Sequence, residues 1–384
     1  MKQPPLSLYV HLPWCVRKCP YCDFNSHTAG DSAPKERYIK ALLCDLDGEA
    51  VRADGRVLES IFLGGGTPSL FSPDEIGRVL EAARSRFSIA PDVEVTMEAN
   101  PGTVECGSPA GYRDAGVTRL SVGAQSFDDA RLKALGRIHS SEDISRAVRA
   151  AWDGGFENIN IDLMHGLPGQ SVDAAMADLT SAADLKPAHI SWYQLTLEPN
   201  TVFYARPPAN LPDEELAAEI QDRGQALLEG LGYEQYEISA FAKDGRRCRH
   251  NLNYWLFGDY LAVGAGAHGK LTTGNAVYRY QKPANPLQYM KDQETGRIDP
   301  SLTALERTDL MFEFMLNALR LSAGFTEEIF CQRTGLSTSD LMNATAGARA
   351  RGLLERNPGG LWKPTELGGR FLNDLQAEFL PDEP

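Results

Sequence analysis

The chain has 384 residues, of which 42% are hydrophobic and 23% are charged, proportions that are ordinary for a soluble globular protein. Its 52 acidic and 38 basic side chains give a formal net charge of −14, and a negative field repels nucleic-acid phosphates. The composition therefore argues against nucleic acid as the main partner.

The N-terminal sequence "MKQPPLSLYVHLPWC" contains one lysine, two early prolines and no long apolar segment. No stretch of the chain approaches the roughly 18 consecutive apolar residues of a membrane span, so we expect neither a signal peptide nor a transmembrane helix. The seven cysteines are odd in number and scattered, which is unlike a secreted disulfide framework. We therefore expect a cytoplasmic protein with reduced thiols.

From residue 6 to about residue 238, short apolar runs alternate with amphipathic helical patterns. The predicted strands are 6–12, 59–66, 93–99, 119–126, 158–166, 189–196 and 233–239. The predicted helices are 34–53, 72–87, 128–153, 170–185 and 212–231. Most strand positions are apolar, as they are where both faces of a sheet are covered, so the repetition predicts a parallel sheet with right-handed crossovers.

These six or seven units are too few for a complete (β/α) barrel, so an incomplete open barrel and a doubly wound sheet both fit. Polar residues at the strand ends favour the incomplete barrel. Glu98, Gln125 and Asp162 each lie at or just past the carboxyl end of a predicted strand, as do the glycines of "GGGTP" (64–68). Active sites of parallel α/β folds gather at that edge.

Beyond about residue 240 the alternation ends. Residues 246–269 are aromatic and glycine-rich, and we expect an irregular loop plus one strand there. Helices are predicted near 304–320, 325–334 and 338–351, followed by a hairpin with a Pro-Gly-Gly turn and a last helix. This order is typical of a mainly helical, winged-helix-like domain.

Such a domain often contacts nucleic acid, but residues 301–384 hold 8 basic and 12 acidic side chains, so we expect a structural or docking module. Three parts are therefore predicted. Residues 1–240 form the partial barrel, 241–300 form a connecting region that closes the barrel mouth, and 301–384 form the C-terminal domain.

Three cysteines directly follow the first predicted strand in "YVHLPWCVRKCPYCDF" (9–24). Cys15, Cys19 and Cys22 form a C-x3-C-x2-C pattern that lacks the second ligand pair of a structural zinc site. A [4Fe–4S] cube is usually held by cysteine, and three thiolates would leave one iron open to an exchangeable ligand. Buried free cysteines, or zinc completed by a distant ligand, are the alternatives.

This pattern resembles the radical S-adenosylmethionine (SAM) superfamily, in which SAM chelates the open iron of a [4Fe–4S] cluster through its amino and carboxylate groups. The chain is also similar, from residue 6 almost to its end, to the oxygen-independent coproporphyrinogen III oxidase family. The fragments that carry this likeness are "YVHLPWC", "GGGTPS", "MEANPGT", "VGAQSF", "LGRIH", "DLMHGLPGQ" and "HNLNYW". The fold implied is an incomplete (β/α) barrel of radical SAM type.

Two departures favour the heme chaperone branch of that family over the oxidases. The oxidases carry an extra cysteine two places after the third cluster cysteine, where this chain has Phe24. They also have a longer N-terminal extension, whereas only 14 residues precede Cys15 here.

The resemblance implies that Cys15, Cys19 and Cys22 hold the iron–sulfur cluster. It assigns to SAM binding Gly65, Gly66 and Thr67 on the glycine-rich loop, together with Tyr9, Glu98, Gln125, Arg137 and Asp162. The structural alternatives are a plain strand-to-helix turn, a packed tyrosine, satisfied polar groups inside the barrel and a surface arginine.

The fragment "HNLNYW" (250–255) is the candidate heme site. His250 offers an imidazole, the commonest axial ligand of heme iron, while Tyr254 and Trp255 offer flat apolar surface for a porphyrin. A histidine satisfied inside an aromatic core patch is the alternative. Cys248 is a rival thiolate ligand, and His268 is a further candidate.

The resemblance thus implies a cytoplasmic heme chaperone that carries a SAM-capped [4Fe–4S] cluster and delivers heme to an acceptor hemoprotein. A membrane-bound respiratory acceptor would bring the chain to the inner face of the membrane. We expect a monomer or a homodimer that forms with its cofactors. The alternatives are radical SAM decarboxylation of coproporphyrinogen III and nucleic-acid contact through the C-terminal domain.

Overall fold

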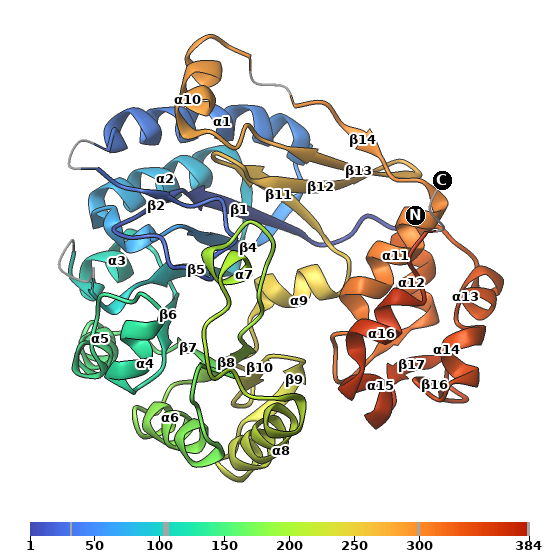
Figure 1. The fold of residues 1–384 in the computed structure, drawn as a ribbon. Helices are drawn as coiled ribbons and strands as arrows, with labels where there is room; N and C mark the ends of the chain where they lie inside the picture. Colours follow the sequence, from blue (N-terminus) through green and yellow to red (C-terminus); the bar gives the residue numbers. More distant parts are fainter. Residues whose placement is uncertain (31–32, 103–106, 298–299, 382–384) are drawn as a thin grey trace.

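The computed structural model describes residues 1–30, 33–102, 107–297 and 300–381, and these contain one large curved sheet (Figure 1). Its strand order is β14-β13-β12-β11-β1-β4-β5-β6-β7-β8-β10-β9. Six neighbouring strands are parallel: β1 (Leu6–Leu12), β4 (Val57–Gly65), β5 (Ser88–Ala99), β6 (Arg119–Gln125), β7 (Ile159–His165) and β8 (His189–Gln194). Across the described residues the two edge strands do not pair with each other, so the sheet is open, and the predicted incomplete barrel is confirmed.

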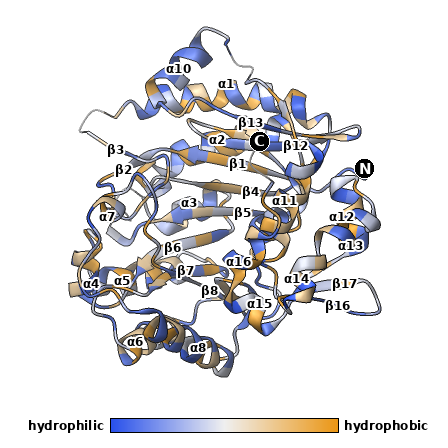
Figure 2. Ribbon diagram, turned by 45° about the vertical axis from the view of Figure 1, so that its right-hand side comes forward, coloured by the Kyte–Doolittle hydropathy of each residue, from blue (hydrophilic) through white to orange (hydrophobic). Residues whose placement is uncertain are grey.

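Helices cover the outer face of this sheet (Figures 1 and 2). They are α1 (Lys35–Ala53), α2 (Pro73–Arg86), α3 (Pro109–Ala115), α4 (Asp129–Ala134), α5 (Ser141–Asp153), α6 (Val172–Asp184) and α8 (Glu214–Gly230). The single helix predicted over 128–153 is two helices, because Ser140 and Asp143 form a capping box that starts α5 anew. The break between them carries Arg137.

The predicted strand 233–239 exists, but it does not continue the parallel series. β9 (Glu234–Glu237) is antiparallel to β10 (Ala240–Ala242), which is antiparallel to β8. The link between β9 and β10 is too short for the crossover that parallel strands require.

Residues 246–269 are more regular than the expected loop plus one strand. They contain α9 (Arg249–Trp255), β11 (Asp259–Val263) and the start of β12 (His268–Thr273). β11 pairs in parallel with β1, and β12, β13 (Ala276–Gln281) and β14 (Thr303–Ala304) extend that edge in antiparallel order. α10 (Pro286–Glu294) packs against α1.

The C-terminal part is helical with a small sheet, as predicted for a winged-helix-like domain. Its helices are α11 (Arg307–Ala318), α12 (Glu327–Thr334), α13 (Thr338–Ala344), α14 (Ala346–Ala350), α15 (Glu366–Arg370) and α16 (Leu372–Ala377). β16 (Leu354–Arg356) and β17 (Leu361–Pro364) form the predicted hairpin, to which β15 (Phe325–Thr326) adds a third strand. The part has its own core, which includes Phe314, Phe330 and Trp362.

Short elements surround the cysteine pattern. β2 (Trp14–Cys15) and β3 (His27–Thr28) form a separate parallel pair, and residues 15–26, from the last residue of β2 to the residue before β3, are called the cysteine loop below. The 3-10 turn η1 (Pro68–Leu70) follows the glycine-rich loop, and α7 (Val202–Ala205) follows β8. The backbone N–H of Phe203 in α7 donates to the carbonyl of Pro20 at 3.0 Å, so α7 supports the cysteine loop.

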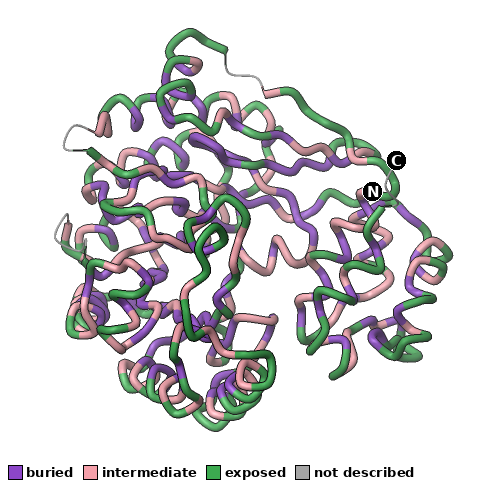
Figure 3. Tube along the Cα trace, viewed as in Figure 1, coloured by how far each residue is buried: buried purple, intermediate pink, exposed green. Residues whose placement is uncertain are grey.

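Buried residues run along the central strands (Figure 3). A buried ion network ties the sheet to α1. Lys282, just after β13, donates to Asp45 Oδ1 at 2.6 Å and to Glu49 Oε1 at 2.7 Å, and all three side chains are buried. Loss of any one of these side chains would destabilise the fold, because a remaining charge would lose a buried partner.

Lys282→Met leaves Asp45 buried without the cation that pairs with it, while Glu49 keeps its ion pair with Arg52 at 2.7 Å. We expect the free energy of unfolding at neutral pH to fall by about 3–5 kcal/mol, the cost of breaking a buried ion pair. Urea denaturation measures the change. Lys291→Met on the exposed side of α10 is the control, and equal stability of the two variants would contradict the prediction.

Candidate functional site

A cavity of about 740 Å³ opens at the carboxyl ends of the parallel strands. Its walls come from the cysteine loop, the glycine-rich loop, the ends of β5 to β8 and the α15–α16 segment. Among its lining residues are ten of the predicted site residues: Cys15, Cys19, Cys22, Gly65, Gly66, Thr67, Glu98, Gln125, Arg137 and Asp162. The structure therefore brings most of the predicted site together in one place.

The three cysteine thiols face this cavity from one loop. Burial raises the pKa of Cys15 and of Cys22 above the usual thiol value, and Ser26 Oγ lies 3.7 Å from Cys22 Sγ. In the described part of the chain, no three His, Cys, Asp or Glu side chains converge on the position of a single metal ion. Three cysteine thiols on one loop are the donor type that usually holds a [4Fe–4S] cube, in which each thiolate binds a different iron.

The glycine-rich loop is fastened to the strand that leads into the cysteine loop. Gly66 N–H donates to Leu12 O and Thr67 N–H donates to Trp14 O, both at 2.8 Å. A Cβ atom on Gly66 would lie 2.7 Å from Trp14 O, and one on Gly65, whose φ is +111°, would overlap the His11 ring. The glycines are thus required for this close backbone approach.

Two carboxyl groups lie at the floor of the cavity. Burial, followed by the nearby charge of Asp162, raises the pKa of Glu98 to about 8, although Gly65 N–H donates to Glu98 Oε2 at 3.1 Å. Burial also raises the pKa of Asp162, which accepts hydrogen bonds from Ser121 Oγ at 2.7 Å and Asn160 Nδ2 at 2.8 Å. Such a floor favours ligand groups that donate hydrogen bonds or carry positive charge.

Arg137 is part of the cavity wall and not a surface cation. Its Nη2 donates to Gly123 O at 2.6 Å, and its Nη1 lies 3.7 Å from Cys19 Sγ. Its Nε is buried and has no hydrogen-bond partner among the residues described. Gln125 follows a bulge in β6 with a φ of +70°, so its side chain leaves the strand beside this arginine.

Tyr9 lies behind the cavity. Its hydroxyl is 3.1 Å from His11 Nδ1, and its ring stacks on Phe62 with centroids 6.2 Å apart. It is not among the residues that line the cavity. Its contact with SAM stays a prediction.

His250 also lies outside this cavity, on α9 inside the barrel. Its Nδ1 is 3.0 Å from Ser60 Oγ and its Nε2 is 3.0 Å from Tyr254 OH, so both ring nitrogens are engaged. Burial lowers the pKa of His250 to about 3. In this arrangement neither nitrogen is free to bind an iron atom.

The rival heme ligands are placed differently. Cys248 is fully buried, its thiol lies 3.5 Å from Glu94 Oε1, and burial raises its pKa to about 12, so it holds its proton at neutral pH. His268 is exposed at the start of β12. Neither side chain lines the cavity.

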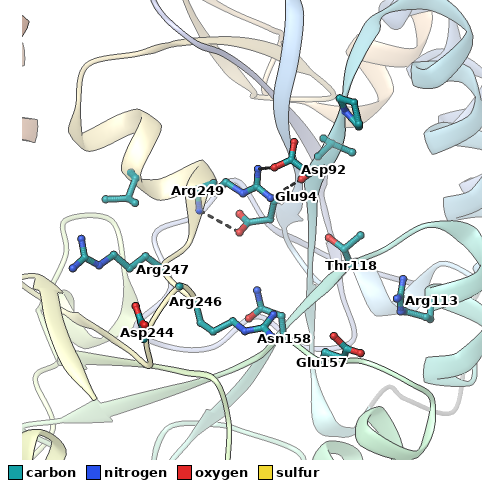
Figure 4. A pocket seen from close by; sticks show the side chains of 14 residues that line it. Asp92, Glu94, Arg113, Thr118, Glu157, Asn158, Asp244, Arg246, Arg247 and Arg249 are labelled. Atoms are coloured by element: carbon teal, nitrogen blue, oxygen red, sulfur yellow. Dashed lines mark hydrogen bonds and ion pairs between the residues drawn. The ribbon is translucent and has the colours of Figure 1, made fainter. Parts of the chain in front are cut away.

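A second pocket, of about 770 Å³, lies at the amino ends of the strands, where α9 meets β5 (Figure 4). Arg249 N–H donates to Glu94 Oε2 at 3.2 Å, and its guanidinium pairs with Asp92 at 2.8 Å. Four arginines and four acidic residues line it: Arg113, Arg246, Arg247, Arg249, Asp92, Glu94, Glu157 and Asp244. The four positive and four negative charges cancel, so this pocket does not select for a charged ligand. The glycine-rich loop and the three cysteines line the first cavity, which is therefore the candidate site.

Several residues of the site were not predicted. Ser121 and Asn160 hold Asp162, and Asn160 could have been found because it lies two positions before Asp162 on the same face of β7. Arg370 and Phe371 of the C-terminal part also line the cavity. No local pattern in the sequence signals that contact.

Comparisons with known proteins show the family of the chain. Residues 9–180 match the Radical SAM superfamily, and residues 305–371 match the HemN C-terminal domain. The heme chaperone HemW of Escherichia coli (strain K12) is 47% identical over the full length of both chains. The chain belongs to the HemW family.

Other members of the HemW family are less similar but match over nearly the same length. The heme chaperone HemW of Bacillus subtilis (strain 168) is 32% identical over 97% of this chain and 99% of that protein. Coproporphyrinogen III oxidase (HemN) from Escherichia coli, a radical SAM enzyme, shares the fold, with a TM-score of 0.80 and 24% identity over 98% of this chain and 90% of that one. Within the described residues, no helix is long and apolar enough to cross a membrane.

Gly66→Ala should displace the cysteine loop, because the added methyl group meets the backbone of Pro13 and Trp14. We expect less iron and sulfide per chain after anaerobic reconstitution, and a loss of about 1–3 kcal/mol in the free energy of unfolding. Gly230→Ala, where a Cβ atom meets nothing within 4 Å, is the control. Equal iron content in the two variants would contradict the prediction.

The raised pKa of Glu98 predicts a pH dependence of stability. Between its ordinary pKa of 4.5 and its folded value of about 8, the folded chain keeps a proton that the unfolded chain releases. The contribution of this group to stability therefore falls as pH rises through that window, by at most about 1.4 kcal/mol per pH unit.

We expect Glu98→Gln to gain stability relative to the wild type as pH rises from about 5 to about 8. Urea unfolding of both chains without a cluster, at several pH values in that range, measures the difference. A constant difference in the free energy of unfolding would show that Glu98 titrates normally.

Proposed function

We propose that this protein is a heme chaperone that binds a SAM-capped [4Fe–4S] cluster and heme, and passes the heme to an acceptor protein. The observation that carries the proposal is the cavity in which three cysteines, a glycine-rich loop, two carboxyl groups and Arg137 meet. Full-length similarity to proteins named heme chaperone supports it.

The residues at the cavity fit the cluster and SAM by their chemistry. Cys15, Cys19 and Cys22 would hold three irons, and the fourth iron would be chelated by the amino acid part of SAM. Arg137 offers a guanidinium with an unpartnered buried Nε, which suits a carboxylate. Glu98 and Asp162 suit an ammonium group or sugar hydroxyls, with Gly65, Gly66, Thr67 and Gln125 completing the binding surface.

A reduced cluster held by Cys15, Cys19 and Cys22 would have the chemistry to donate an electron to SAM. In the chaperone proposed here, the cluster and SAM would instead serve a structural or regulatory role. The role of the residues of this chain would be to bind the cluster and SAM and to orient them relative to each other. The hydrogen bonds of Gly66 and Thr67 to the strand before the cysteines fix the distance between the SAM-binding loop and the thiols.

A chaperone is favoured over decarboxylation of coproporphyrinogen III by the residue that follows the cysteine pattern. Phe24 takes the position of the additional cysteine of the oxidases, and its ring lines the cavity. The protein named as an oxidase shares only 24% sequence identity with this chain, a level of similarity that supports a common fold and not a common activity.

Delivery completes the proposal. The chain would act in the cytoplasm, and a membrane-bound respiratory hemoprotein as acceptor would bring it to the inner face of the membrane. Binding of cluster and SAM would favour a homodimer over a monomer. The net charge of −14 repels nucleic-acid phosphates, so we do not propose nucleic acid as a partner.

Anaerobic reconstitution followed by iron, sulfide and heme counts tests the proposal. We expect roughly four irons and four sulfides per wild-type chain and stoichiometric uptake of heme from added hemin. A triple serine substitution of Cys15, Cys19 and Cys22 should lose the iron and sulfide. A double serine substitution of Cys44 and Cys331 should keep them.

Two outcomes would overturn the proposal. A cluster-loaded wild-type chain that takes up no heme is not a heme chaperone. Anaerobic conversion of coproporphyrinogen III to protoporphyrinogen in the presence of SAM and a reductant would assign the oxidase activity.

A further inference from the structure

Two large aromatic rings stand exposed in the wall of the cavity. Phe24 on the cysteine loop is 58% exposed, and Phe371 at the junction of α15 and α16 is 52% exposed. They come from opposite ends of the chain, yet both line the same space. Exposed aromatic side chains in one concave site are typical of a ligand-binding surface.

Apolar side chains line the cavity together with polar ones. Leu195, Ile238 and Leu372 contribute aliphatic side chains, and Tyr193 adds a third aromatic ring. None of these residues belongs to the polar floor formed by Glu98 and Asp162. The cavity therefore offers apolar surface in addition to its polar floor, and the part around Phe24 and Phe371 is called its outer part below.

Cations lie at the outer part. Arg17 lines the cavity beside the cysteines, and its side chain has no hydrogen-bond or ion-pair partner among the described residues. Arg370 lines it next to Phe371 and pairs with Asp222 at 3.0 Å and Glu366 at 3.6 Å, in an exposed arrangement that an incoming carboxylate can replace. The buried carboxyls of the floor, and Asp23 and Asp374 on the wall, direct an anionic group toward these arginines.

We propose that Phe24 and Phe371 hold the planar tetrapyrrole, with its carboxylates on Arg17 and Arg370. The inference rests on the proposed function and gives the heme a location at the outer part of the cavity, away from His250. The C-terminal domain then forms one side of the heme-binding site, and the cysteine loop forms the other. Apolar faces suit the macrocycle, and arginine suits its two carboxylates.

Hemin titration of the full chain with its cluster reconstituted tests this, read by difference spectra in the Soret region. We expect Phe24→Ala, Phe371→Ala and Arg370→Glu each to raise the Kd roughly ten-fold, and the Phe24/Phe371 double variant to raise it further. The matched controls are Val16→Ala on the cysteine loop and Leu367→Ala on α15, which are 45% and 47% exposed and do not line the cavity. Both controls should bind hemin as the wild type does.

The outcomes separate the location from the function. If the wild type binds hemin and the Phe24, Phe371 and Arg370 variants bind it equally well, the location is wrong and the proposed function stands. If His250→Ala abolishes binding while its far-UV circular dichroism, melting temperature and iron content match the wild type, the heme lies at α9. If the wild type binds no hemin, the proposed function itself fails.

Discussion

The pairing of the glycine-rich loop with the strand before Cys15 is the constraint on which the rest of the site depends. The β2–β3 pair closes the base of the cysteine loop, and the glycine-rich loop fixes the strand that leads into it. The hydrogen bonds from Gly66 and Thr67 to Leu12 and Trp14 do this, and they need a backbone approach that no side chain at residue 66 permits. The same hydrogen bonds therefore fix both the position of the three thiols and the conformation of the glycine-rich loop.

The electrostatics of the cavity follow from the open sheet. Strand ends that converge on one edge bring Glu98 and Asp162 out of water, and burial raises the pKa of both carboxyls. The break between α4 and α5 adds Arg137 to the same cavity. Asn160 and Ser121 each donate to Asp162, which holds its carboxylate in one orientation. A ligand that brings a positive group or hydroxyl donors relieves this cost, so the floor is prepared for such a ligand before it binds.

The parallel strands and the residues at their carboxyl ends could be predicted, because hydrophobic periodicity and strand polarity are local signals. Strand pairing at the edges could not, since β11 joins β1 across more than 240 residues of chain. The role of His250 was equally open in the sequence. A histidine beside aromatic residues suits both a heme site and a core, and only the neighbours Ser60 and Tyr254 show that it is enclosed.

No pattern in the sequence predicted that Phe371 would be exposed in the cavity. Its position follows from the way the chain divides into two separately packed cores. One core lies between the barrel strands and the helices that cover them, and the other lies inside the C-terminal domain. The cavity is lined by residues of both parts. A flat ligand between Phe24 and Phe371 would bury apolar surface of both parts at once, so its binding free energy would depend on their relative position. A movement of the C-terminal domain relative to the barrel would then change the affinity for such a ligand, because the ligand binds the two arrangements with different free energies.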